Sequence, residues 1–335
     1  MNKRRCLLFF VLILPFFLSC ANRGTSAGLS RDSSKNPPED PAEKPPADLY
    51  WKKTTGPEGG RITDRMGNSV PLARYRRIIA ISPGAVETLY LIGAEDSILA
   101  ISQGRDLIWP EEKTPLLPTI GNQARPNAEL IVSMEPDLII GNTMNVSLIE
   151  DFRNRGYRTV IHGAYHMEDI FNNTLLMGIL TGHEEEAEIL VAAKRAKLDT
   201  IKADLAEHPL GLKGAFLYAA NPIMAFTGAT LAGDALRILG VENIAEKLNI
   251  AEPILSPEYI LAENPDFLFG SISFRTPGDL LAADPVIAQT RAGREKFIRI
   301  VPTALFLRSS PRMVEKLLEL YNEIKDYNHS VASGG

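Results

Sequence analysis

"NAELIVSMEPDLIIG" (127–141) returns later in the chain as "SPEYILAENPDFLFG" (256–270), and the two copies align without a gap. In each copy a residue that favours helix N-caps, Asn127 or Ser256, precedes a short helical segment that ends at a proline. An apolar run follows, and a short apolar run bounded by turn residues is typical of a buried strand. The chain therefore contains one helix–turn–strand unit twice, which predicts two similar lobes.

The two copies share five identical positions, too many within fifteen residues for chance similarity to be a strong alternative. These pairs are Glu129 and Glu258, Ile131 and Ile260, Pro136 and Pro265, Asp137 and Asp266, and Gly141 and Gly270.

Around the repeat, short apolar runs alternate with amphipathic segments. This alternation is typical of βα units and of mostly parallel sheets with helices on both faces. The predicted strands are 77–82, 97–102, 137–141, 158–163, 214–219, 266–271 and 297–301, and the predicted helices include 83–93, 147–156, 231–240 and 311–324.

A different segment, 183–208, lies midway between the two sets of strands. It has no Gly or Pro, begins with a glutamate cluster that suits the positive end of a helix, and carries apolar residues at helical spacing. We therefore expect an α/β fold of two lobes of mostly parallel sheet covered by helices, joined by a single long interdomain helix.

The N-terminus has the pattern of a secretory signal peptide. Lys3, Arg4 and Arg5 precede an apolar run that ends at Leu18, too short to span a bilayer comfortably. The segment 18–20, Leu-Ser-Cys, resembles the lipobox of bacterial lipoproteins, which implies removal of residues 1–19 and lipidation of Cys20. An ordinary secretion signal that happens to contain a cysteine is the competing interpretation.

The segment after Cys20 predicts a tether. It includes "RDSSKNPPEDPAEKPPAD" (31–48), whose Pro, Ser and alternating charges cannot bury a core. We expect a disordered tether over 20–60 that holds a folded body of roughly 275 residues, enough for two lobes of ordinary size.

The charge balance excludes one class of partner. Loss of residues 1–19 changes the formal net charge from −5 to −8. An acidic body argues against nucleic acid as a ligand.

In parallel α/β lobes, ligands bind beyond the carboxyl ends of the strands. The loops that begin there are rich in aromatic rings and arginine, which suit a large, partly anionic chelate or macrocycle. From these loops we expect ligand contacts by Trp109, Asn142, Tyr165, His166, Phe226, Phe274, Arg275 and Arg308.

Competing interpretations accompany these residues. Each aromatic ring, including Phe306, could pack inside its own lobe. Arg275 and Arg308 are less easily assigned to a core, because arginine is seldom buried unless it is paired. Arg308 could instead pair with a carboxylate of its own lobe.

The histidines do not suggest a site for a transition metal without a chelator. His183 and His208 flank the long helix, and His329 lies in the C-terminal tail. His162 and His166 remain, short of the usual three or four ligands, so no metal site is predicted. A haem would need an axial ligand, for which Tyr165 or His166 would serve.

The motifs typical of common enzymes do not occur in this chain. A nucleophile elbow, a Walker loop, His-Glu-x-x-His and Gly-x-Gly-x-x-Gly are all missing from the sequence. We expect a binding protein without an intrinsic cofactor rather than an enzyme.

Together these features resemble the periplasmic substrate-binding proteins of iron-siderophore, haem and vitamin B12 importers. The resemblance covers nearly all of 60–328. Four segments carry it by their order along the chain: "RITDRMGNSVPLARYRRIIAISPGAVETLYLIGAEDSILAIS" (61–102), the first copy of the repeat, "TGATLAGDALRILGVENI" (227–244) and "SSPRMVEKLLEL" (309–320). It implies an N-terminal lobe over 61–182, a linking helix over 183–208, a C-terminal lobe over 209–328 and limited hinge motion. The run "RSSPR" (308–312) looks closer to the cobalamin-binding members.

The resemblance also implies partners. The protein would be a monomeric, lipid-anchored lipoprotein of the cell envelope, facing the periplasm or the cell exterior. It would capture cobalamin, haem or a ferric siderophore and deliver it to the permease dimer and ATPase of an ABC transporter. By the same resemblance, Glu129 and Glu258 would dock one lobe each onto the permease. A lipid-anchored adhesin, or a binder of free transition metal or oxyanion, is the alternative.

Overall fold

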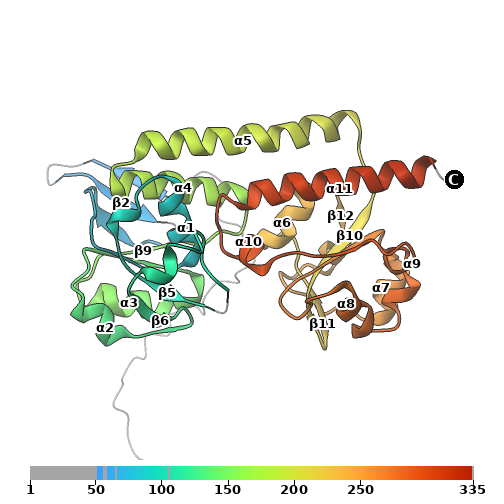
Figure 1. Ribbon diagram of the computed structural model, residues 1–335, viewed down its shortest axis with the longest axis horizontal. Coiled ribbons are helices and arrows are strands. Elements are labelled where there is room, and N and C mark those ends of the chain that lie inside the picture. The colour runs from blue at the N-terminus through green and yellow to red at the C-terminus, as the bar shows by residue number, and fades with distance from the viewer. Residues whose placement is uncertain (1–50, 56–58, 65, 105, 334–335) are drawn as a thin grey trace, which may run out of the picture. The chain divides into compact units, whose positions relative to one another are not determined.

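The computed structural model describes residues 51–55, 59–64, 66–104 and 106–333 (Figure 1). The predicted signal peptide, Cys20 and most of the predicted tether lie outside the described residues.

The N-terminal lobe is built on a six-stranded sheet in the order β7-β6-β5-β4-β8-β9, in which only β6 and β7 pair antiparallel. Its strands are β4 (Ile78–Ala80), β5 (Ile98–Gln103), β6 (Thr119–Asn122), β7 (Arg125–Pro126), β8 (Leu138–Gly141) and β9 (Thr159–Ile161). Its α-helices are α1 (Pro83–Leu91), α2 (Ala128–Ser133) and α3 (Val146–Asn154). Three short 3₁₀ helices accompany them: η1 (Glu95–Ser97), η2 (Thr114–Leu116) and η3 (Thr143–Asn145).

The C-terminal lobe has a five-stranded sheet in the order β11-β10-β13-β14, with β12 also paired to β10. Its strands are β10 (Lys213–Ala220), β11 (Ile223–Ala225), β12 (Glu242–Asn243), β13 (Phe267–Gly270) and β14 (Ile298–Ile300). Its helices are α6 (Leu231–Ile238), α7 (Pro257–Glu263), α8 (Pro277–Ala283), α9 (Arg291–Arg294) and α10 (Thr303–Leu307), with η4 (Ile244–Leu248) and η5 (Ile287–Gln289).

The central strands of these two sheets are buried on both faces. Successive residues of a strand point to opposite faces, and in β4 Ile78 and Ile79 belong to two different apolar clusters although both are fully buried. In β10 the same division separates Phe216 from Leu217. This is why the strands read as continuous apolar runs rather than as alternating patterns.

One long helix, α5, runs over both lobes and connects them (Figure 1). In α5 (Glu184–Glu207), Ala187 packs into the apolar cluster of the N-terminal lobe, whereas Val191 and Ile201 pack into that of the C-terminal lobe. The helices α4 (Met167–Thr181) and α11 (Met313–Ser333) pack along α5. The predicted fold class, two α/β lobes joined by one long helix, is confirmed. Helix α11 is longer than the predicted 311–324.

The repeat forms the same unit in both lobes. Asn127 Oδ1 accepts a hydrogen bond from the Leu130 amide (3.0 Å) at the start of α2, and Ser256 Oγ accepts one from Tyr259 (3.2 Å) at the start of α7. Ile131 and its counterpart in α7 are both buried.

The repeated aspartates fasten the next strand. The Asp137 carboxylate accepts hydrogen bonds from the amides of Arg76 (2.8 Å) and Arg77 (3.0 Å), and its own amide donates to the Arg77 carbonyl. Asp266 repeats this arrangement with the backbone of Lys213. The Lys213 amide donates to the Asp266 carboxylate at 2.7 Å, and the Asp266 amide donates to the Lys213 carbonyl at 2.8 Å. Each aspartate thus holds the amino end of one strand beside the strand that it precedes.

The predicted tether extends too far. Residues Trp51–Thr54 form β1, which pairs antiparallel with β2 (Arg61–Asp64), and β2 pairs with β3 (Ser69–Pro71). Trp51 Nε1 donates to the Asn172 carbonyl at 3.0 Å. The apolar pattern missed β1 because three of its four residues are exposed.

The lobes meet where α1 begins. A Cβ atom added to Gly84 would lie 1.6 Å from the Arg308 carbonyl oxygen, closer than any contact that real Cβ atoms make. Glycine is therefore required at this position by the approach of the opposite lobe's backbone.

We expect Gly84→Ala to destabilise the fold by about 1–3 kcal/mol, because the two lobes must shift to admit the methyl group. Chemical denaturation measures the loss. Gly278→Ala is the matched control, since its Cβ would meet nothing closer than 3.5 Å. Equal stability of the two variants would contradict this account of the contact.

Candidate functional site

Phe226 follows β11, which pairs antiparallel with β10, and its amide donates to the Phe216 carbonyl in the middle of β10. The other predicted ligand residues follow the carboxyl ends of parallel strands, as the sequence indicates. In each lobe these ends meet at one edge of a parallel sheet, where ligand sites of α/β proteins form. The residues do not all present their side chains there.

Two of the predicted phenylalanines lie in the core of the C-terminal lobe. Phe226 is 6 % exposed, stacks on Tyr218 with ring centroids 4.3 Å apart and meets Phe216 edge to face. Phe274 is 3 % exposed and packs in the other apolar cluster of that lobe. Phe306 is fully buried. These three rings pack inside their own lobe, which is the alternative that the sequence allowed for each of them.

Asn142 follows β8 and is used locally. Its side chain is buried, and Oδ1 accepts a hydrogen bond from the Met144 amide at 2.8 Å, which starts η3. This turn leaves Met144 highly exposed.

Tyr165 and His166 follow β9 and lead into α4. The Tyr165 side chain is 41 % exposed. His166 Nδ1 lies 3.7 Å from Oδ1 of Asp234, a buried carboxylate of α6. Burial alone would raise the pKa of Asp234, but hydrogen bonds from His166 and from the Met167 amide, together with Arg237, lower it overall.

The two predicted arginines are in different states. Arg275 is exposed at the start of the loop into α8, and its amide donates to Asp279 Oδ2 at 2.8 Å. The Arg308 side chain is only 12 % exposed and pairs with Glu87 of α1, 3.2 Å away. The pairing that the sequence allowed for Arg308 therefore exists, but the carboxylate belongs to the opposite lobe.

Trp109 follows β5 and is half-buried. The Cζ atom of Arg312 lies 4.9 Å from the centroid of its ring, within reach of a cation–π interaction. Arg312 belongs to the C-terminal lobe, so this contact also crosses between the lobes.

Sequence reasoning missed a set of exposed apolar side chains after the same strands. They are Leu107 (58 % exposed), Met144 (65 %), Ile272 (46 %) and Leu307 (37 %). Ile272 has a φ of 51°, in the left-handed region that a β-branched residue rarely adopts, and its amide donates to Thr303 Oγ1 at 3.2 Å. Strain of this kind is concentrated at functional sites. An isoleucine between two serines directly after a buried strand is the signal that could have indicated it.

Glu129 and Glu258 are exposed in the first turns of α2 and α7. The Glu258 carboxylate accepts hydrogen bonds from the Glu258 amide and from the Ser256 side chain, and these lower the pKa of Glu258. The two glutamates occupy equivalent places in the two lobes because the units that carry them have the same hydrogen bonds.

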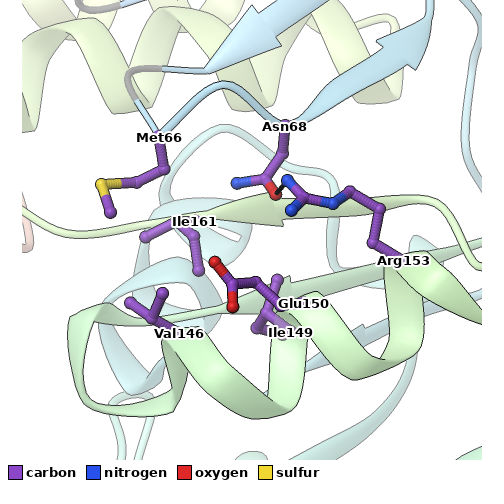
Figure 2. A pocket seen from close by; sticks show the side chains of 7 residues that line it. All are labelled: Met66, Asn68, Val146, Ile149, Glu150, Arg153 and Ile161. Atoms are coloured by element: carbon purple, nitrogen blue, oxygen red, sulfur yellow. Dashed lines mark hydrogen bonds between the residues drawn. The ribbon is translucent and has the colours of Figure 1, made fainter. Parts of the chain in front are cut away.

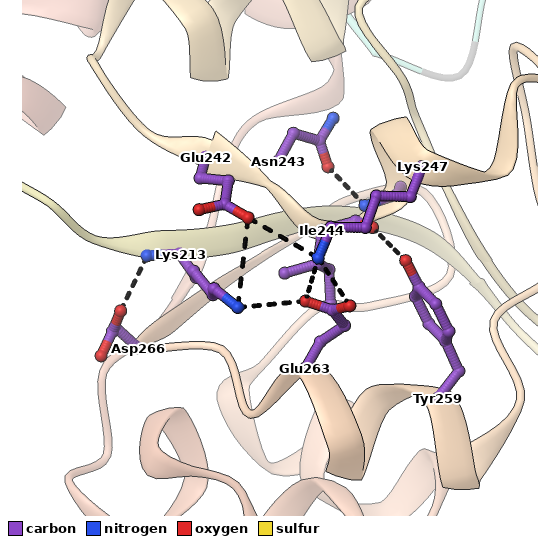
Figure 3. Close-up of polar contacts among 9 residues, drawn as sticks. Lys213, Glu242, Asn243, Ile244, Lys247, Tyr259, Glu263 and Asp266 are labelled. Carbon is purple, nitrogen blue, oxygen red and sulfur yellow. Dashed lines mark hydrogen bonds and ion pairs between the residues drawn. The ribbon is translucent and has the colours of Figure 1, made fainter.

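The far end of α7 is tied to its lobe by Glu263 (Figure 3). Lys247 Nζ lies 2.7 Å from Glu263 Oε1, and Lys213 Nζ lies 3.2 Å from Oε2. A hydrogen bond from Lys247 is the main cause that lowers the pKa of Glu263. The helix is therefore held at its C-terminal end, while Glu258 in its first turn is exposed.

Two hollows in the surface lie away from the predicted ligand residues. The first, of about 20 Å³, lies between the β2–β3 turn and α3 and has room for about one water molecule. Figure 2 shows its lining: Met66, Asn68, Val146, Ile149, Glu150, Arg153 and Ile161. The second, of about 410 Å³, is lined by Glu295, Lys296, Phe297, Arg299, Glu323, Asp326, Tyr327 and Ser330. Neither includes a residue that the sequence singled out.

The described residues contain no helix with the length and apolarity needed to cross a bilayer. Within the same part of the chain, no three His, Cys, Asp or Glu residues come together in a way that could hold a metal ion.

His162 lies at the carboxyl end of β9 but is 1 % exposed. Its Nδ1 is 3.2 Å from Ser82 Oγ, and its Nε2 is buried without a hydrogen-bond partner among the described residues. Burial lowers the pKa of His162 to about 4. This histidine is a neutral core residue rather than a ligand displayed at the surface.

The family model described as "Periplasmic binding protein" matches residues 78–305, more than half of the chain. The chain therefore belongs to the periplasmic binding protein family. The matched range begins at β4 and ends in α10, so it contains both copies of the repeat and the linking helix.

Individual relatives are more distant. The chain is 24% identical over 263 residues to the "Vitamin B12-binding protein" of Pectobacterium atrosepticum. This alignment covers 75% of this chain and 89% of the relative. The structure is similar to that of the periplasmic vitamin B12 binding protein BtuF of Vibrio cholerae, with a TM-score of 0.65 and 19% identity over 77% of this chain and 99% of the other. It is also similar to the periplasmic heme-binding protein RhuT of Roseiflexus sp. RS-1, with a TM-score of 0.65 and 23% identity over 76% and 99%. At these identities the two structures show a shared fold and nothing more.

We expect the buried His162 to make stability depend on pH. The folded-state pKa of about 4 lies below the ordinary value of 6.5, so the unfolded chain binds more protons between these two values. The contribution is fully present above pH 6.5 and is lost as pH falls toward 4, by on the order of 3 kcal/mol.

Urea denaturation at pH 7.5 and pH 5 measures this loss. His162→Asn should lose less stability than the unaltered chain between these pH values. His208→Asn, at an exposed helix end, should lose as much as the unaltered chain. The same pH dependence in all three proteins would show that His162 is not the cause.

Proposed function

We propose that this protein is the substrate-binding lipoprotein of an ABC importer for a metal chelate: cobalamin, haem or a ferric siderophore. The observation that carries the proposal is the family match across 78–305 in a chain whose two lobes repeat one unit. The relative named vitamin B12-binding protein and the fold shared with vitamin B12 and heme binders support this class of ligand.

The proposed ligand site joins the strand-end loops of both lobes. The N-terminal lobe would contribute Trp109, Tyr165 and His166, and the C-terminal lobe would contribute Arg275. Exposed Met144 and Ile272 would add apolar contacts that suit the face of a macrocycle. Asn142, Phe226, Phe274 and Arg308 would support these loops, since all four have buried or nearly buried side chains.

Docking to a permease dimer is the proposed role of Glu129 and Glu258. Four of the five identities in the repeat have structural explanations: the isoleucines are buried, the prolines end the helices, the aspartates fasten strands, and the glycines lie against packed side chains. The glutamates are the exposed pair. Complementing a helix N-terminus requires no such matching between lobes, whereas a two-fold symmetric partner does.

The envelope location rests on the family and on the N-terminal sequence. We propose that lipid on Cys20 anchors a monomeric protein to a membrane, facing the periplasm or the cell exterior. The ATPase and permease of the transporter would be its partners.

We expect one member of a panel of cyanocobalamin, haemin and ferric siderophores to bind more tightly than about 10 µM, which corresponds to about −7 kcal/mol. In a Trp51→Phe background Trp109 is the only tryptophan, so quenching of its emission reports binding beside it; calorimetry confirms the affinity. No binding by any member would contradict the proposed function.

For the ligand that binds, Ile272→Ala should weaken affinity because it removes an exposed apolar contact at the strand end. Ile189→Ala is the matched control, since Ile189 is 63 % exposed on α5, away from the strand ends. Equal affinities of the two variants would remove Ile272 from the site.

We expect Cys20→Ser to release the protein from the membrane fraction or to leave it uncleaved. Fractionation and intact-mass measurement distinguish these results. A mature, membrane-bound Cys20→Ser protein would contradict lipid anchoring.

We expect Glu129→Ala with Glu258→Ala to abolish uptake and permease binding while ligand affinity and melting temperature stay nearly unchanged. The reason is that both side chains lie on the surface and not among the proposed ligand contacts. Glu188→Ala with Glu207→Ala on α5 makes the same charge change at exposed positions and should transport normally. Normal transport by the first pair would reduce these glutamates to helix-start residues.

A further inference from the structure

Two arginines of the C-terminal lobe converge on one carboxylate of the N-terminal lobe. Arg308 Nη1 lies 3.2 Å and Arg312 Nη1 lies 3.4 Å from Oε1 of Glu87. Glu87 is fully buried in α1. A buried carboxylate is costly unless it is paired, so this carboxylate depends on cations that the opposite lobe supplies.

Arg308 makes several contacts with the N-terminal lobe. In addition to Glu87, its Nη1 donates to the Leu107 carbonyl at 2.7 Å and its Nη2 donates to the Asp106 carbonyl at 2.8 Å. Both carbonyls belong to the loop that carries Trp109. With 12 % of its side chain exposed, Arg308 has little surface left for a ligand.

Arg312 is in a different position. Its side chain is 29 % exposed, and its guanidinium covers the Trp109 ring from 4.9 Å. Two positive charges face one negative charge at this contact, so one charge remains uncompensated among these three residues. That charge lies beside an aromatic ring of the proposed ligand site.

We propose that Glu87 is a positioning residue that gives the two arginines different roles. It fixes Arg308 to the loop of Trp109, and it holds Arg312 over the Trp109 ring, where Arg312 is the cation that meets an anionic group of the ligand. A carboxylate or phosphodiester carried on a flat macrocycle fits this pair, since the ring can stack and the anion can accept guanidinium hydrogen bonds.

The positioning part can be tested without any ligand, whereas the anion contact rests on the proposed function. In the Trp51→Phe background, acrylamide quenching at a temperature far below melting reports how well Trp109 is covered. We expect Glu87→Gln, which keeps the shape but removes the charge, and Arg312→Met to increase quenching. Arg291→Met is the matched control, because Arg291 pairs with Asp266 inside the C-terminal lobe and should leave Trp109 unchanged.

The ligand arm uses haemin, with two carboxylates, and cyanocobalamin, with one phosphodiester. Arg312→Met should lose about tenfold or more in affinity for the one that binds, as expected for a hydrogen bond to a charged group, at nearly unchanged melting temperature. Arg312→Lys should recover part of the loss. Arg308→Met should instead lower the melting temperature.

The possible results separate the two ideas. Unchanged quenching in Glu87→Gln and Arg312→Met overturns the positioning role; should Glu87→Gln fail to fold, the partly exposed Arg312→Met decides alone. Unchanged affinity in Arg312→Met overturns the anion contact. If neither compound binds the unaltered chain, the anion contact with a flat macrocycle is overturned, and the proposed function then depends on the ferric siderophores alone. The quenching result still decides the role of Glu87.

Discussion

The carboxylates of Asp137 and Asp266 hold the amino ends of β4 and β10, and the placement of the strand-end loops depends on the register that they help to set. Asp137 precedes β8 and binds the amides before β4, so Ile78 pairs with Leu138. Asp266 binds Lys213, and Gly214 pairs with Phe267 in the other lobe. A slip of one residue would turn every side chain of such a strand to the opposite face. With the register held, the carboxyl ends of neighbouring strands meet at one edge of each sheet.

The two edges then depend on contacts between the lobes. Gly84 admits the Arg308 carbonyl at a distance that no side chain would permit, and Glu87 receives two guanidinium groups a turn further along α1. Tight backbone contact and buried charge pairing at one place oppose wide separation of the lobes. A linking helix that packs against apolar clusters of both lobes acts in the same direction. Binding through small adjustments of loops suits this architecture better than a wide opening.

The internal repeat separates structural requirements from surface ones. A residue that recurs because the unit needs it to fold is buried or bonded to the backbone, as the isoleucines and aspartates are. A recurring residue that is exposed, such as Glu129 or Glu258, has no equal need within its own lobe. Figure 3 shows the ion pairs of Glu263 that hold the C-terminal end of α7.

Much of this molecule was determined by local sequence. Apolar runs of strand length, cap residues and the two-copy unit identified the strands around the repeat, α5 and the division into lobes, because these signals act over a few neighbouring residues. The β1 strand was not predicted, because its exposed residues leave no apolar pattern in the sequence. Which loop residues face solvent was decided only by tertiary structure. Phe226 and Tyr165 both follow strands, yet one ring is stacked in a core and the other is exposed. Arg308 and Arg312 lie four residues apart, and both pair with Glu87, from a helix more than two hundred residues away. The carbonyls of Asp106 and Leu107 bind Arg308 alone and so distinguish the two, since burial and pairing depend on what the folded chain brings near.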